Sequence, residues 1–297
     1  MNQPSMRIEP PYRPEFEYPL SALAPTAQAE SVREPLSLAH RLLNHDGIRK
    51  ILILAVLAVI WEIVGRWQDN ELLLPTFTAT IGAMWADLVN GELPARMAIS
   101  LSVLLQGYAL GVILAFFLTT FAISTRLGRD VLSTLTSMFN PLPAIALLPL
   151  ALMWFGLGTT SLLFVLVHSV MWPLALNTFA GFQSVPQTLR MAGQNYGLRG
   201  LRFVWQILIP AALPSIVSGL KVGWAFAWRT LIAAEMVFGA SSGQGGLGWY
   251  VFQHRNELET AQVFAGLVMV VILGLVVENL VFTTLEKMTV RRWGTQQ

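Results

Sequence analysis

Charged side chains inside long apolar stretches are the residues of this sequence best placed to do chemistry. Lys221 and Arg229 stand eight residues apart in one such stretch, and Glu235 follows six residues after Arg229. On an ideal helix of about 3.6 residues per turn, the two cations lie about 80° apart and Glu235 lies about 240° from Arg229. A charge inside an apolar segment usually faces a wet cavity or a partner. The two cations therefore either attract an anion into a pathway or pair with a neighbouring helix, on which Glu278 is an available acid.

Three polar residues in other apolar stretches are weaker candidates for lining such a pathway. They are Asn140, His168 and Asn177. Each of them also fits a hydrogen bond between two helices, and the sequence leaves both roles open. Glu62 and Arg66 are spaced i, i+4 in the order that favours an ion pair, so we expect that pair to be structural.

Several other chemistries find no support in the sequence. The chain has no cysteine, which excludes disulfides, thiolate metal sites and cysteine nucleophiles. Its four histidines show no metal-ligand spacing, so no metal site is expected. Residues 239–243 fit G-x-S-x-G, but a nucleophile elbow needs a strand before it, and an apolar stretch precedes this one. No G-x-x-x-x-G-K-[ST] sequence occurs, so this chain is not expected to bind ATP.

The elements that must position these residues are long and apolar. Of 297 residues, 54% are hydrophobic and only 12% are charged, whereas soluble domains have about 25% charged residues. A spanning helix needs about 20 predominantly apolar residues. Six stretches have bilayer length: Ile51–Trp67, Met97–Ile123, Val131–Phe155, Ser161–Phe182, Ile207–Phe238 and Ala261–Leu285. Barrel strands would be about half as long and would alternate in polarity, so we predict an all-α membrane protein of about six spans.

The distribution of basic residues predicts the orientation. Fourteen of the 19 lysines and arginines fall on the side of the N-terminus, three fall on the opposite side, and two lie within the fifth span. Without the three arginines of the long N-terminal segment, the count is still 11 against 3. Because basic residues accumulate in cytoplasmic loops, both termini are predicted to be cytoplasmic. The net charge of only +2 argues against a nucleic-acid partner.

Three regions follow from these spans. Residues 1–50 contain seven prolines and no long apolar run, which predicts a largely disordered cytoplasmic tail and not a signal peptide. Residues 51–290 form the membrane domain, and residues 291–297 form a short cytoplasmic tail. Within the domain, Phe77–Asn90 has apolar residues at helical spacing and is predicted to lie flat on the outer surface. Gly107 and Gly111 have the G-x-x-x-G spacing of closely packed helices.

The long connection 183–206 contains the motif that identifies a family. Importer permeases driven by an ATP-binding cassette have a cytoplasmic loop of the form E-A-A-x3-G-x9-I-x-L-P, and this sequence resembles it with complete spacing. The matching residues are Met191, Ala192, Gly193, Gly197, Ile207 and Pro210. Two departures from the motif matter: Met191 replaces the glutamate, and Gly193 replaces the second alanine. Gly197 is expected to allow a turn between two short helices, and Pro210 fits the first turn of the fifth span.

Further short motifs are similar to the nitrate, sulfonate, taurine and bicarbonate branch of these permeases. They are Trp61-Glu62, Leu73-Leu74-Pro75, Pro141-Leu142-Pro143, Trp154-Phe155-Gly156-Leu157-Gly158, Asn177-Thr178-Phe179-Ala180-Gly181, Ala234-Glu235-Met236 and Gly246-Leu247-Gly248. Related sequences often have a basic residue at the place of Lys221, which favours pairing there. They usually have an uncharged residue at the place of Arg229, whose role stays open.

The resemblance implies a type I importer permease fold in the bacterial inner membrane, with the connection 183–206 coupling it to an ATPase. It also implies a homodimer, two cytoplasmic ATPase subunits that bind ATP and magnesium, and a periplasmic or tethered solute-binding protein. The chain itself is expected to be neither an enzyme nor a cofactor-binding protein. The solute is expected to be a small anion such as a sulfonate, taurine, nitrate or bicarbonate, and an aromatic carboxylate stays open. The alternative is a self-contained secondary transporter, for which Glu235 and Glu278 are the available protonatable acids.

Overall fold

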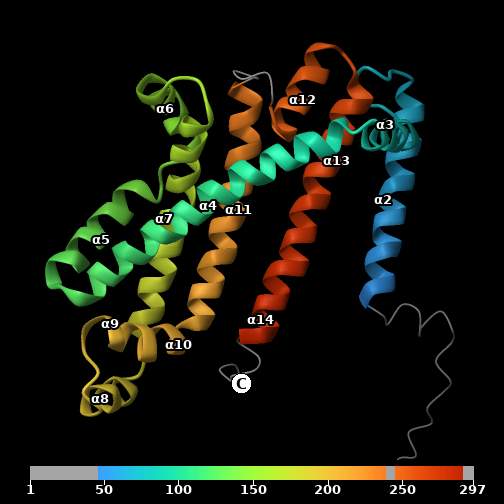
Figure 1. Cartoon of the computed structure of the whole chain (residues 1–297). Helices are drawn as coiled ribbons and strands as arrows, with labels where there is room; N and C mark the ends of the chain where they lie inside the picture. Colours follow the sequence, from blue (N-terminus) through green and yellow to red (C-terminus); the bar gives the residue numbers. More distant parts are fainter. Residues whose placement is uncertain (1–45, 239–244, 290–297) are drawn as a thin grey trace, which may run out of the picture. The chain divides into compact units, whose positions relative to one another are not determined.

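The computed structural model describes residues 46–238 and 245–289, and every regular element in them is a helix (Figure 1). The predicted tail 291–297 and most of the predicted tail 1–50 lie outside the described residues. The last residues assigned to the N-terminal tail begin α2 (Asp46–Gln68). The contact pattern divides the chain after Leu57, so the first half of α2 belongs to one unit and everything from Ala58 onward belongs to a second unit.

The second unit holds the candidate site residues. Its further elements are α3 (Phe77–Val89), α4 (Glu92–Ser124), α5 (Arg126–Phe139), the 3-10 helix η1 (Ala144–Leu147), α6 (Leu148–Phe155), α7 (Thr159–Ser184), α8 (Gln187–Asn195), α9 (Gly200–Phe203), the π-helix η2 (Val204–Leu208), α10 (Ile209–Ala211), α11 (Leu213–Phe238), α12 (Leu247–Asn256), α13 (Thr260–Val277), the π-helix η3 (Glu278–Phe282) and α14 (Thr283–Thr289). Within this unit, α8 and α10 lie at one end, and α12 lies with α3 at the other (Figure 1).

The predicted all-helical membrane class is confirmed, although the count of six spans is not. Among the described residues, three helices are long and apolar enough to cross a membrane unbroken: Glu92–Ser124, Thr159–Ser184 and Thr260–Glu286. Two further spans exist only as bent pairs of helices, which raises the number to at most five. The predicted first span lies in α2, which is not among these five.

The predicted third span, Val131–Phe155, is wrong as a single helix. Arg126–Phe139 and Ala144–Phe155 meet at an angle of 88°. Asn140 ends α5, and Pro141 and Pro143 follow it. A proline lacks the N–H that would continue the helix and disfavours the helical conformation of the residue before it.

The predicted fifth span, Ile207–Phe238, is also broken. Gly200–Ala211 meets Leu213–Val237 at 80°, with Pro210 before the bend and Pro214 after it. The membrane helix of this pair therefore begins at Leu213. Pro210, which was expected in its first turn, lies in the preceding segment.

Small residues bring α4, α7 and α11 close together. A Cβ atom on Gly107 would lie 2.6 Å from Cβ of Leu166, and one on Gly111 would lie 2.7 Å from Cβ of Val170. The predicted close packing is thus confirmed, and its partner is α7. A Cβ atom on Gly181 would similarly lie 2.5 Å from a side chain of α11. Such contacts are typical of helix packing in membranes, where backbones approach closely.

The amphipathic segment forms α3, and two branch motifs hold its start. The Trp61 indole donates a hydrogen bond to the carbonyl of Pro75 at 3.0 Å. The Glu62 carboxylate accepts the backbone N–H of Thr78 at 3.0 Å and so satisfies a donor in the first turn of α3. Glu62 also pairs with Arg66 at 2.7 Å, which confirms the expected structural pair. The position of α3 on a membrane surface stays a prediction.

Candidate functional site

A cavity of about 300 Å³ lies where α5, the proline bend, α7 and α11 meet. Its lining includes Phe139, Asn140, His168, Trp172, Phe226 and Thr230. Two of the predicted pathway residues, Asn140 and His168, are thus brought to one site from different helices. The bend after α5 makes this possible, because Asn140 stands where the chain turns toward η1.

The aromatic part of the lining contains polar atoms without partners. Neither ring nitrogen of His168 has a hydrogen-bond partner among the described residues, and the same is true of the Trp172 indole nitrogen. The rings of Phe139 and Trp172 stack with centroids 5.3 Å apart, and the His168 ring meets each of them edge-on at 6.1 Å. Buried polar atoms are normally hydrogen-bonded. These nitrogen atoms are themselves buried, so they lie behind the cavity surface, and a bound molecule would reach them only if the rings moved.

Asn177 is not part of this cavity. It lines a separate, more open hollow of about 440 Å³ between α7 and the start of α11, together with Ser218. Its side-chain amide donates to the carbonyl of Pro173 at 2.8 Å. The predicted lining residues of α7 therefore divide between two hollows, both of which lie between α7 and α11.

The two cations of α11 differ in their surroundings. Lys221 pairs with Glu278 of η3, with 3.3 Å between Nζ and Oε1, so the expected pairing is confirmed. Arg229 is exposed, and no described residue forms a hydrogen bond or ion pair with it. At about 100° per residue, Arg229 lies about 60° around the helix from Phe226, which lines the cavity. It lies about 100° from Thr230, the other residue of α11 in the lining, so Arg229 flanks the lining residues without being one of them.

Glu235 lines neither hollow and instead caps α12. It is 4% exposed, and its carboxylate accepts hydrogen bonds from Ser100 Oγ at 2.9 Å and from the backbone N–H of Gly248 at 2.8 Å. Ser100 Oγ in turn accepts the N–H of Leu247 at 2.8 Å. Negative charge is favourable at the N-terminus of a helix. The pathway role predicted for Glu235 stays a prediction, and its contacts are those of a helix cap.

Two glycines allow this cap to form. A Cβ atom on Gly246 would lie 2.1 Å from Ser100 Oγ, and one on Gly248 would lie 2.5 Å from the carbonyl oxygen of Ile232. No larger residue fits either place without displacing backbone or the cap itself. The branch motifs around Glu235 and Gly246 are therefore two halves of one structural unit.

The connection 183–206, for which coupling to an ATPase is predicted, turns at Gly197 as the sequence indicates. Gly197 has φ +77°, in the left-handed region that favours glycine. Its N–H donates to the carbonyl of Gln194 at 2.9 Å, and the N–H of Leu198 donates to the carbonyl of Gly193 at 3.1 Å. These two bonds form a Schellman motif, which ends α8 and directs the chain into α9.

The motif position occupied by Gly193 is a packing contact. Gly193 is buried, and a Cβ atom on it would lie 3.0 Å from Cγ1 of Ile207 and 3.1 Å from the ring of Phe203. Ile207 belongs to the π-helix η2, just before Pro210. Met191 is 55% exposed. Together with the neighbouring Ala192, it faces away from this contact.

Arg190 has a structural role that the amino-acid sequence alone does not reveal. It was counted only as a basic residue, but its guanidinium donates to the carbonyls of Phe182 and Val185. Cations interact favourably with the free carbonyls at the C-terminal end of a helix. The side chain therefore ties α8 to the end of α7.

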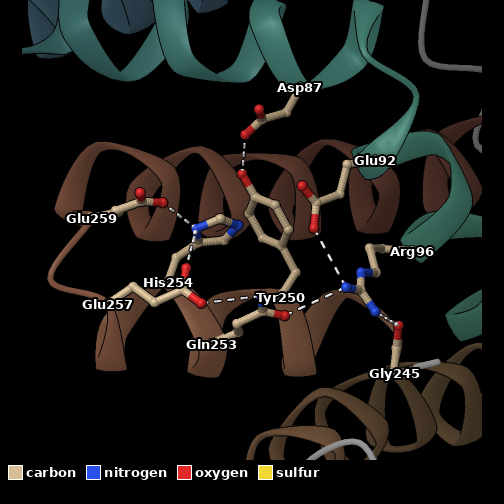
Figure 2. A network of polar contacts seen from close by, with 9 residues as sticks. All are labelled: Asp87, Glu92, Arg96, Gly245, Tyr250, Gln253, His254, Glu257 and Glu259. Carbon is tan, nitrogen blue, oxygen red and sulfur yellow. Dashed lines mark hydrogen bonds and ion pairs between the residues drawn. The ribbon is translucent and has the colours of Figure 1, made fainter. Parts of the chain in front are cut away.

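A polar network near α12 also escaped the sequence reasoning (Figure 2). His254 Nδ1 lies 2.7 Å from Oε2 of Glu259 and 3.6 Å from Oε2 of Glu257. The side-chain atoms of these three residues that could bind a metal lie within 4.8 Å of one another. This grouping was not predicted from the sequence. The spacing His-x-x-Glu-x-Glu at 254–259 is the signal that was available.

The same network joins four helices. The Tyr250 hydroxyl of α12 donates to Asp87 of α3, and burial, followed by this hydrogen bond, raises the pKa of Tyr250. Arg96 of α4 donates to the carbonyl of Gly245 at 3.0 Å, and Glu259 stands at the start of α13. Figure 2 shows these side chains converging from their separate elements. The arrangement holds α3, α4, α12 and α13 together.

Comparison with known proteins identifies the family of this chain. Residues 107–293 match the family described as binding-protein-dependent transport system inner membrane component. A putative ABC transporter permease of Methanocaldococcus jannaschii is 31% identical over 78% of this chain and 87% of its own length. The taurine transport permease of Escherichia coli is 30% identical (76% of this chain, 82% of the relative), and its putative aliphatic sulfonates permease is 28% identical (73% and 82%). The chain belongs to the binding-protein-dependent inner membrane components and is a transmembrane permease of an ABC importer in the nitrate, sulfonate and taurine branch.

Proposed function

We propose that this permease forms the pathway for a small anion of the sulfonate, taurine, nitrate or bicarbonate type. The observation that carries the proposal is Arg229, an exposed cation with no ion pair among the described residues, three residues after Phe226 in the lining of the cavity. A fixed positive charge at a pathway raises the local concentration of anions. The names of several relatives, which refer to sulfonates, taurine and nitrate, agree with an anionic solute.

The connection 183–206 docks a separate ATPase subunit that binds ATP and magnesium, while this chain needs no cofactor. Exposed apolar side chains gather on α8 and at its C-cap, where Leu189, Met191 and Tyr196 are exposed by 39%, 55% and 87%. Single exposed apolar residues are common, but a group of them on a short helix fits a protein partner. Movement of α8 reaches the membrane helices through two contacts, Gly193 on Ile207 and Arg190 on the end of α7.

The working assembly contains two copies of this chain, two ATPase subunits and a solute-binding protein on the opposite side of the membrane. The excess of lysine and arginine, 14 against 3, supports cytoplasmic termini in a bacterial inner membrane. Closure of the ATPase pair moves α8, shuts the inner side of the pathway and opens the outer side. The solute released by the binding protein then enters beside Arg229.

The alternative of a self-contained secondary transporter has less support. It requires an acid near the membrane midplane that is free to bind and release protons. Glu235 is engaged as the cap of α12, and Glu278 is paired with Lys221. Both available acids therefore have structural partners.

Gly197 provides the test of ATPase coupling. A β-branched residue at φ +77° is strained, and the left-handed conformation costs non-glycine residues about 1–2 kcal/mol. We expect Gly197→Val to reduce the amount of ATPase that co-purifies with the permease about tenfold, with normal permease levels in the membrane. Gly197→Asn is the matched control, because asparagine tolerates this conformation. Normal ATPase recovery and normal solute-stimulated hydrolysis in Gly197→Val would contradict the coupling role.

A further inference from the structure

A basic pocket lies where α4 and α7 end, on the side that the basic residues predict to be cytoplasmic. Its volume is about 220 Å³, and its lining consists of Ile123, Arg129, Gln183, Val185, Gln187 and Arg190. The lining thus contains two arginines and two amides but no carboxylate.

The pocket lies at the depth of lipid headgroups. Gln183 stands in the last turn of α7, and Val185 is the C-cap of this helix. The 26 residues of α7 extend over about 39 Å at 1.5 Å per residue. A bilayer is about 40–45 Å thick with its headgroup regions. Because α7 is long and apolar enough to cross a membrane, its end lies among the headgroups.

Arg129 brings an unneutralised charge to the pocket. It is exposed on the first turns of α5, and no described residue forms a hydrogen bond or ion pair with its side chain. Asp130 is the only acidic residue between Thr125 and Gln206 in the sequence, a stretch that contains five arginines. Asp130 does not line the pocket. The field inside the pocket therefore favours an anion.

Arg190 contributes the second cation from α8. Its Nε–H donates to the carbonyl of Val185 at 3.2 Å, and an Nη–H donates to that of Phe182. These bonds offset the negative end of α7, which would otherwise repel an anion. A guanidinium has five N–H donors, so the other donors of Arg190 are not used by any described residue.

The start of α8 adds to the same field. Gln187 is the first residue of α8, and the N-cap Pro186 makes no side-chain hydrogen bond to the helix. The first N–H groups of a helix have no partner within the helix and favour a bound anion. Two arginines and an uncapped helix start thus converge on one pocket from α5 and α8.

A phosphate group fits this pocket in size and chemistry. The planar fork of a guanidinium matches phosphate oxygens. A cavity of about 150 Å³ in another protein is sufficient to bind benzene, and a phosphate group is smaller than benzene. Basic pockets between membrane helices on the cytoplasmic side bind the headgroups of anionic lipids. Ile123 and Val185 supply apolar surface for the carbon part of such a headgroup.

We propose that this pocket is a binding site for the phosphate group of an anionic phospholipid. The phosphate lies between Arg129 of α5 and Arg190 of α8, and the acyl chains enter the bilayer. The bound lipid joins α5 to the connection 183–206. The inference goes beyond the proposed function and depends neither on the solute nor on the ATPase.

Native mass spectrometry of the full-length permease in detergent tests the site. The probes are phosphatidylglycerol and phosphatidylcholine with identical acyl chains, and the dissociation constant of each is determined. We expect phosphatidylglycerol to bind about 25-fold more tightly, since each of two basic residues favours an anionic lipid about fivefold. Equal affinity for the two lipids would overturn the proposal.

Substitutions in α5 locate the lipid. Arg129→Gln should weaken phosphatidylglycerol binding about fivefold without changing phosphatidylcholine binding or the melting temperature, because the side chain has no partner to lose among the described residues. Arg129→Lys keeps the charge and should retain most of the affinity. Arg126→Gln is the matched control, because Arg126 is an exposed arginine of the same helix outside the lining. Equal losses in Arg126→Gln and Arg129→Gln would show attraction to general surface charge and would overturn the site.

Inorganic phosphate separates the lipid from a soluble ligand with the same group. Added in tenfold excess over phosphatidylglycerol, it should displace little of the lipid, since it lacks the acyl chains. Complete displacement of the lipid at this ratio would show that the pocket binds soluble phosphate and would overturn the assignment to a phospholipid. Retention of the lipid in wild type, with loss in Arg129→Gln alone, supports it.

Discussion

The start of α12 and the cavity beside α11 differ in whether their polar groups have hydrogen-bond partners within the chain. At the start of α12, Glu235 has partners within the chain: it accepts hydrogen bonds from the Ser100 hydroxyl and the N–H of Gly248. At the cavity, the ring nitrogens of His168 have no partner among the described residues. Arg229 on the adjacent face has none either. Both regions are near α11, yet the acid at the start of α12 is paired within the chain, whereas the His168 nitrogens and Arg229 are not paired with any described residue.

This contrast separates structural from functional polar residues in a membrane helix. Both Glu235 and Arg229 are charged residues of α11, and both were candidates for the pathway. A buried charge with all its hydrogen bonds made serves the fold, because removing it would leave its partners unsatisfied. An unpaired charge beside a cavity is free to interact with a solute. The partners of a charge, more than its presence, distinguish the two roles.

The largest effect is expected from removing the cap of α12. Glu235→Ala leaves the N–H of Gly248 and the hydroxyl of Ser100 without their acceptor, at a cost of about 3 kcal/mol. Glu235→Gln keeps an acceptor of the same shape and should cost less. Thermal unfolding of the purified permease measures the difference. Glu235→Ala with normal stability but no transport would instead place Glu235 in the pathway.

A smaller effect is expected from the contact between α8 and η2. Gly193→Leu forces a side chain against Ile207 and Phe203, and such overpacking typically costs about 1–3 kcal/mol. We expect reduced solute-stimulated ATP hydrolysis in the assembled importer. Gly193→Ala, which restores the family alanine, brings a Cβ atom to 3.0–3.1 Å from side-chain atoms of Ile207 and Phe203; because these atoms need to shift by only a few tenths of an ångström, this variant should be tolerated. Equal activity of the leucine and alanine variants would show that this contact does not transmit movement.

The smallest effect is expected from the paired cation. Lys221 and Glu278 are 41% and 52% exposed, and exposed ion pairs contribute about 0–1 kcal/mol. Lys221→Gln should therefore change neither the melting temperature nor solute uptake appreciably. A large loss of uptake without a loss of stability would show that Lys221, too, acts on the solute.

The sequence predicts the helices of this fold better than their bends. Apolar length and spacing indicated α4, α7 and α3, and the spacing of Gly107 and Gly111 indicated close packing. The bends after Phe139 and Ala211 were missed, because hydropathy averages over a proline that stops the helical hydrogen bonds.

The site was predictable only in part, because its residues come together through tertiary structure. Asn140 and His168 were candidates as polar residues in apolar segments, but Trp172 and Phe226 looked like ordinary apolar residues. The cap formed by Glu235 depends on Ser100 from α4, a contact across 135 residues. No local pattern reports such a contact, so the acid looked like a pathway residue.

The most direct measurement is the uptake of radiolabelled sulfonate by reconstituted importer containing Arg229→Gln, with the melting temperature determined on the same preparation. We expect uptake to fall about tenfold, which corresponds to about 1.4 kcal/mol, while the melting temperature and basal ATP hydrolysis stay at wild-type values. Unchanged uptake would contradict a role for Arg229 in the pathway. A lowered melting temperature would show that Arg229, like Glu235, has a structural partner.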